Sequence, residues 1–182
     1  AERTEGLRTQ AMAYQSLTTK RVMAGYELVA VVAQDVAGAD GLWRRRESSD
    51  AIDALLQEAR SNGFALVLDV QVGHSTVPAE LAYLRPYLEQ PDVHLALDPE
   101  FDMAADQRPG VEIGHMPASD VTYAMSFLGQ LVVANHLPNK VLIVHQFTVH
   151  MLPDRQQIGR SPFVDVVLDM DGFGSQPLKL DT

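Results

Sequence analysis

Five apolar runs alternate with polar, helix-forming stretches along the chain. Each run is continuously apolar over most of its length, which is typical of strands buried on both faces. The runs cover residues 22–33, 64–68, 93–98, 140–146 and 164–170, and the stretches that predict helices cover residues 1–19, 48–62, 76–90 and 119–136. Alternation at this spacing predicts a parallel sheet covered by helices.

The predicted helices carry recognisable start signals. Ser48 or Ser49 precedes the second helix, Thr76 the third and Ser119 the fourth, each with a side-chain oxygen that can cap a helix. Residues 99–118 contain three prolines and no sustained periodicity, which indicates a long loop of the kind that is usually functional or mobile. A short helical piece at 151–158 and a final helix starting after residue 174 complete the prediction.

The order of these elements predicts an α/β fold formed by one domain over residues 1–182. Five parallel strands could form an open doubly wound sheet or most of a (β/α) TIM-like barrel, which typically needs eight strands and about 250 residues. The chain begins on a helix and stops just after a strand. We therefore expect a partial or incomplete (β/α) barrel.

Composition excludes several classes of function. The formal charge is −10 and the pI about 4.9, so binding to nucleic acid through a basic face is not expected. The only basic cluster, residues 44–46, is expected to be a solvated loop. The sequence has no cysteine, no run long enough to span a membrane, and no glycine-rich phosphate motif after any strand. No cofactor is therefore predicted.

Polar side chains gather where the apolar runs end. Asp69 and Gln71 share one face of a strand because strand side chains alternate with period two, and the pairs Asp98/Glu100 and Asp169/Asp171 repeat this spacing. His74, His145 and Gln146 occupy comparable positions. Because parallel strands place their carboxyl ends at one edge, these groups are expected to line one crevice.

Paired carboxylates in a crevice favour hydrolysis of a glycosidic bond, which needs an acid and a base or nucleophile. Glu100 is the expected acid, because crowding by neighbouring aspartates would raise the pKa of a loop carboxyl, and Asp98 or Asp169 is the expected partner. The expected substrate-binding residues are Asp69, Gln71, His74, His145, Gln146 and Asp171. The ligand would be a small molecule or an oligosaccharide from a cell-wall or extracellular polysaccharide.

Other interpretations remain open. Asp98-Pro99 and Asp171-Gly172 are ordinary turn-forming pairs. A metal-dependent hydrolase could use His74, His145 and Asp98, but no HExxH or HxH spacing supports it, and no metal residue is predicted. A non-catalytic carbohydrate- or cation-binding protein could use the same crevice. Glu27, within the first strand, could also point into a barrel interior.

Five segments in fixed order give the chain a family resemblance. LDVQVGHSTVPAEL, VHLALDPEF, PGVEIG, LPNKVLIVHQFT and VVLDMDGFGSQPLK are similar to a family of uncharacterised bacterial proteins that are often predicted to be exported. The resemblance covers about residues 22–180. It implies a TIM-barrel-like, glycosidase-like architecture and an extracellular or cell-envelope location. In the family a further strand and a glycine-rich loop precede the part that corresponds to residues 1–19, and the chain continues beyond the region of Lys179, so the resemblance implies that the present chain is a core fragment or a shortened member. It implies no particular reaction.

Overall fold

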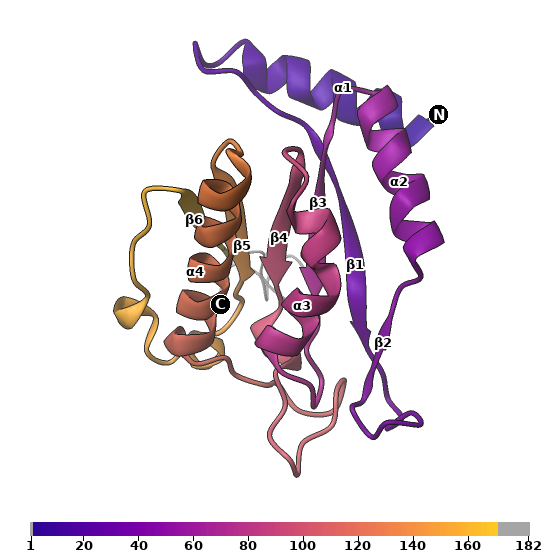
Figure 1. The fold of residues 1–182 in the computed structure, drawn as a ribbon, viewed down its shortest axis with the longest axis vertical. Helices are drawn as coiled ribbons and strands as arrows, with labels where there is room; N and C mark the ends of the chain where they lie inside the picture. The colour runs from indigo at the N-terminus through magenta and orange to yellow at the C-terminus, as the bar shows by residue number, and fades with distance from the viewer. Residues whose placement is uncertain (1, 171–182) are drawn as a thin grey trace, which may run out of the picture.

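The protein is described by a computed structural model that places residues 2–170 (Figure 1). Its centre is a six-stranded sheet in the order β2-β1-β3-β4-β5-β6. The strands are β1 (Gly25–Ala33), β2 (Arg44–Arg46), β3 (Ala65–Val70), β4 (Val93–Leu97), β5 (Lys140–His145) and β6 (Val164–Asp169). All neighbours are parallel except β1 and β2. The predicted α/β class and the five parallel strands are confirmed.

Three helices cover one face of this sheet. They are α2 (Ser49–Ser61), α3 (Val77–Leu88) and α4 (Ala118–Asn135), and Figure 1 shows them in front of the strands. Their buried apolar residues pack on side chains such as Leu66, Leu95 and Leu142, which point to the helix side. A further helix, α1 (Glu2–Gln15), crosses the end where the parallel strands begin and has no buried residue. Short 3-10 turns are η1 (Pro99–Phe101), η2 (Val149–Met151) and η3 (Arg155–Gln157).

Two of the three predicted helix caps are confirmed. Ser48 accepts a hydrogen bond from the backbone of α2 and Thr76 does the same for α3. The prediction for Ser119 is wrong, because α4 already starts at Ala118 and Pro117 occupies the cap position without a side-chain hydrogen bond.

The arginine cluster is an edge strand, and its expected role as a solvated loop is wrong. Arg44 and Arg46 both donate hydrogen bonds of 2.7–3.2 Å to the carboxylate of Glu80 on α3. Glu80 itself has no exposed surface. Burial alone would raise the pKa of Glu80, but hydrogen bonds from Arg46, Ser75 and Arg44 outweigh it and lower the pKa. The pairs therefore fasten β2 to α3.

The described strands form an open sheet with β2 and β6 at its edges. Consecutive parallel strands lie side by side in chain order, with the crossover helices on one face. This winding is shared by open sheets and by segments of (β/α) barrels, and the described strands do not close a barrel. The expected final helix lies outside the described residues. None of the described helices has the length and apolar content needed to cross a bilayer.

Candidate functional site

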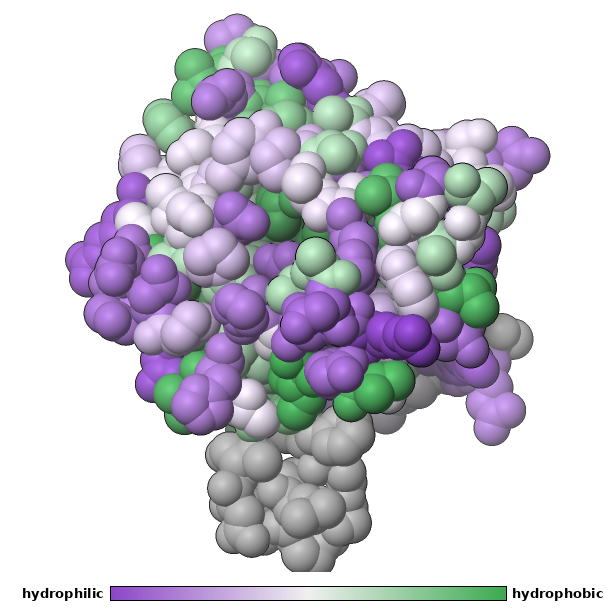
Figure 2. Space-filling model, turned by 90° about the horizontal axis from the view of Figure 1, so that it is seen from below, coloured by the Kyte–Doolittle hydropathy of each residue, from purple (hydrophilic) through white to green (hydrophobic). Residues whose placement is uncertain are grey.

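The face of the sheet opposite the helices carries the predicted polar groups. Strand register places Glu27 opposite Val67 and His145 opposite Asp169, so these side chains share a face with Asp69. No described helix covers this face. Figure 2 views the molecule along the strands from their carboxyl ends, where hydrophilic and hydrophobic residues are mixed. We call the face of the sheet opposite the helices the open face.

A contact across four strands shows that the sheet is curled. Glu27 lies on β1 and His145 on β5, with β3 and β4 between them. Three strand spacings of about 4.8 Å would hold the two side chains roughly 14 Å apart on a flat sheet. Their Oε1 and Nε2 atoms are nevertheless 3.1 Å apart. The sheet must therefore be concave towards the open face, which gathers side chains from several strands.

His145 is the only cation-forming group at the centre of this concavity among the described strand residues. Its Nε2 pairs with Glu27, and its Nδ1 lies 3.7 Å from Asp169 Oδ2. The hydrogen bond to Glu27 raises the pKa of His145 to about 9, with burial opposing and the charges of Asp98 and Asp69 assisting. The imidazole is thus charged at neutral pH and forms an ion pair with Glu27.

Asp69 is a buried acid whose surroundings raise its pKa. Its side chain is at the end of β3, only 3% of the residue is exposed, and its Oδ1 accepts from the backbone N–H of Val70 at 2.7 Å. Burial, followed by the charge and hydrogen bonding of Asp98, raises its pKa well above the ordinary value, although the charge of His145 opposes this. Asp69 therefore retains a proton at pH values where a solvated aspartate has lost it.

Asp98 and Gln71 form the next part of the site. Asp98 directly follows β4, and its Oδ2 accepts from Gln71 Nε2 at 3.0 Å. Gln71 Oε1 in turn accepts from the backbone N–H of Ala33 at 3.0 Å. Both ends of the amide are engaged, so Gln71 fixes the orientation of Asp98 beside Asp69.

Three of these groups could hold a metal ion. One oxygen from each of Glu27 and Asp69 and one ring nitrogen of His145 all lie within 4.8 Å of one another. Carboxylate and imidazole ligands suit several divalent transition metals. The set considered from sequence, His74, His145 and Asp98, is not brought together in this way within the described part of the chain.

The other predicted residues lie around this centre. Glu100 is in η1 rather than on a strand, so the expected shared strand face with Asp98 is wrong. It lines a cavity of about 270 Å³ with Phe101, Ile113 and Phe147. His74 stacks on Trp43 with ring centroids 5.7 Å apart.

Gln146 and Asp171 complete the set of predicted residues. Gln146 is fully buried and donates to the carbonyl of Thr148. Asp171 lies outside the described residues.

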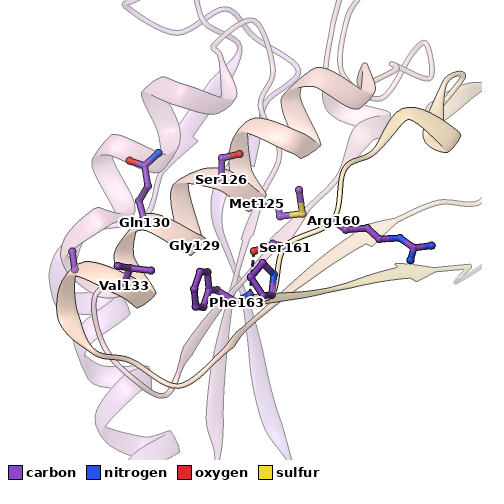
Figure 3. A pocket seen from close by; sticks show the side chains of 10 residues that line it. Met125, Ser126, Gly129, Gln130, Val133, Arg160, Ser161 and Phe163 are labelled. Carbon is purple, nitrogen blue, oxygen red and sulfur yellow. Dashed lines mark hydrogen bonds between the residues drawn. The ribbon is translucent and has the colours of Figure 1, made fainter.

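A separate apolar cavity of about 510 Å³ lies on the helix side. Met125, Gly129 and Val133 of α4 face Ser161–Phe163 across it (Figure 3). Its lining includes no carboxylate or imidazole. Because acid–base chemistry needs ionisable groups, we place the candidate site on the open face instead.

Glu27 is the site residue that the sequence-based list did not include. It lies in the middle of an apolar run, whereas the other groups follow the ends of such runs. The sequence does contain a signal for Glu27, which is a single carboxylate within an apolar strand. Because an unpaired charge inside a sheet is costly, such a residue is expected to have a partner.

Comparisons with known proteins add no assignment. No protein-family model, no curated protein and no solved structure matches this chain.

Proposed function

We propose that the open face is the catalytic cleft of a glycosidase-type hydrolase that acts on a polysaccharide. Asp69, backed by Asp98, is the general acid, and Glu27 is the nucleophile. The observation that carries the proposal is the close approach of Asp69 and Glu27, which offer oxygens within 4.8 Å of each other in different surroundings. Asp69 is a buried acid with a raised pKa, whereas Glu27 is hydrogen-bonded to His145. Two carboxyl groups with separated roles are the requirement of glycoside hydrolysis.

The short separation favours retention of configuration. Retaining glycosidases hold their two carboxyl groups about 5–5.5 Å apart, and inverting enzymes about 6.5–9.5 Å. In the proposed reaction Glu27 attacks the anomeric carbon while the glycosidic C–O bond breaks and the proton of Asp69 passes to the leaving oxygen. Water, deprotonated by Asp69, then hydrolyses the glycosyl ester and restores both groups.

The roles differ from those expected from sequence. His145 becomes a positioning residue that pairs with Glu27, and Asp169 is its second partner. Glu100 lines the neighbouring 270 Å³ cavity with two phenylalanines, which suits a substrate-binding position.

The curled sheet supports a wider proposal about architecture. A concave open face with side chains from β1 and β5 in contact is the arrangement inside a (β/α) barrel. We extend the proposal to a barrel of which these strands are part, to membership of the uncharacterised bacterial family noted above, and to action outside the cytoplasm.

Synthetic substrates can distinguish the proposed roles of Asp69 and Glu27. Both anomers of a panel of 2,4-dinitrophenyl glycosides are assayed with wild type, Asp69→Asn and Glu27→Gln. Because this leaving group needs no proton, Asp69→Asn should lose about 10²–10⁴-fold on oligosaccharides but keep most of its kcat/KM on the activated glycoside. Its kcat on that glycoside should fall after an initial burst of dinitrophenol, because Asp69 also deprotonates the water of the second step and the glycosyl-enzyme accumulates. Glu27→Gln should lose both activities, and a 2-fluoro glycoside should label Glu27 covalently.

A matched control is Glu89→Gln, which removes an exposed carboxylate of the surface pair with Arg85. Circular dichroism establishes that the variants remain folded. Turnover that disappears with EDTA and returns with a divalent metal would contradict the proposal and select a metal-dependent hydrolase, which the three ligand atoms within 4.8 Å would also suit. Oligosaccharide binding without turnover by any form would indicate a binding protein.

A further inference from the structure

The open face has a strongly one-sided charge. On β1, β3, β4, β5 and β6, this face carries four carboxyl groups, those of Glu27, Asp69, Asp165 and Asp169, and no lysine or arginine. Asp69 is buried with a raised pKa, so it is not counted among the negative charges. Asp98 adds a fifth carboxylate just beyond β4. The basic groups there are two imidazoles, those of His94 and His145.

Two basic residues beside this face have acidic neighbours. Arg45 of the edge strand β2 pairs in register with Val32 of β1, and its side chain forms an ion pair with Glu47 at 2.6 Å. Arg3 of α1 lines a cavity of about 500 Å³ beside Glu27, together with Glu2 and Glu58. Acidic groups therefore outnumber basic ones at this edge as well.

Asp165 has no place in the proposed chemistry. It is exposed, pairs in register with Val141, and lies four residues before Asp169, or about 13 Å along β6. It thus extends the negative surface away from the reacting pair, towards the amino ends of the strands. Concave surfaces with one sign of charge raise the local concentration of oppositely charged ligands.

We propose that the substrate of this cleft is a cationic saccharide, a polymer of amino sugars with free, protonated amino groups. This inference rests on the proposed function and specifies its substrate class. Neutral saccharides lack the attraction to the open face, and chains of uronic acids are repelled by it.

Three hexamers test the inference at a mildly acidic pH at which amino groups carry a proton. They are β-1,4-linked glucosamine, its N-acetylated neutral counterpart, and galacturonic acid. For wild type at low ionic strength, kcat/KM should be at least about tenfold higher for glucosamine than for the neutral hexamer. The preference should fall towards unity in about 1 M salt, where the Debye length is about 3 Å.

Asp165→Asn provides the test of the surface itself. It should lower kcat/KM for glucosamine about threefold at low salt, as expected for one charge removed near 6 Å in water, and leave the neutral hexamer unchanged. Glu89→Gln removes the same charge on the helix layer and should change neither rate.

The two proposals fail in different ways. Hydrolysis of the neutral or acidic hexamer at a rate equal to or above that of glucosamine overturns the substrate assignment and leaves the hydrolase intact. A salt-independent preference, or an Asp165→Asn variant with unchanged kcat/KM for glucosamine, also overturns the assignment. No turnover of any hexamer or activated glycoside overturns the proposed function, and the substrate assignment with it.

Discussion

His94 provides the sharpest test of how this fold responds to acid. It lies on β4, only 5% of it is exposed, and its Nδ1 accepts the backbone N–H of Val141 at 3.1 Å. An imidazole can accept at this nitrogen only while it is neutral. Burial, assisted by the charge of Lys140, lowers the pKa of His94 from its ordinary 6.5 to about 4.

The size and direction of the effect follow from these two values. The unfolded chain binds a proton more readily than the folded one, so the stability associated with neutral His94 is complete above pH 6.5 and is lost as the pH falls to about 4. At 1.36 kcal/mol per pKa unit, the complete loss is about 3 kcal/mol. Between pH 6.5 and about 4.5 it is about 2.5 kcal/mol.

The assay is urea unfolding of wild type and His94→Asn at about pH 7.5 and pH 4.5. Asparagine keeps an acceptor near the Nδ1 position but does not titrate, so wild type should lose about 2.5 kcal/mol more than the variant between the two pH values. His150→Gln removes an exposed imidazole and serves as the control. Parallel pH dependence in wild type and His94→Asn would refute the reasoning.

Two further predictions concern the packing behind the site. Glu80→Gln leaves the guanidinium groups of Arg44 and Arg46 beside a neutral amide in a buried position. Thermal unfolding should show that the free energy of unfolding falls by about 3–5 kcal/mol. A fall of less than about 1 kcal/mol would contradict the buried ion pairs. Gly73→Ala places a Cβ 2.7–2.8 Å from two carbonyl oxygens of the β1–β2 connection, whereas Gly110→Ala has a similar positive φ and open space. Chemical unfolding should show a loss of about 1–2 kcal/mol for Gly110→Ala and at least about 2 kcal/mol more for Gly73→Ala. Equal losses would mean that φ alone matters at residue 73.

The parallel strands could be predicted because their signal is local. A run such as residues 64–68 is apolar at every position, and a short apolar run that follows Gly63 and ends in polar residues favours a buried strand. The caps at Ser48 and Thr76 are likewise read within four residues of sequence. The edge strand β2 could not be predicted this way, because Arg44 and Arg46 acquire their partner Glu80 only after α3 packs beside the strand.

For the candidate site, the sequence predicts where several residues lie but not what each of them does. Asp69, Asp98 and His145 follow apolar runs, so the sequence predicts that they lie at one edge of the sheet. Their roles depend on quantities that chain position does not encode. Asp69 and Asp98 have the same functional group and both follow an apolar run, yet Asp69 is buried and Asp98 is half-buried, a difference that no pattern in the sequence encodes.

The contact between Glu27 and His145 could not be predicted from the sequence. Glu27 is 118 residues from His145, and the two strands are not neighbours in the sheet. Period-two alternation assigns each side chain to a face, but a flat sheet and a curled sheet have the same alternation. The curvature that brings β1 and β5 side chains to 3.1 Å results from the twist and packing of all the strands together. A carboxylate within an apolar strand is therefore best examined against every strand that curvature could bring opposite it, rather than against its sequence neighbours alone.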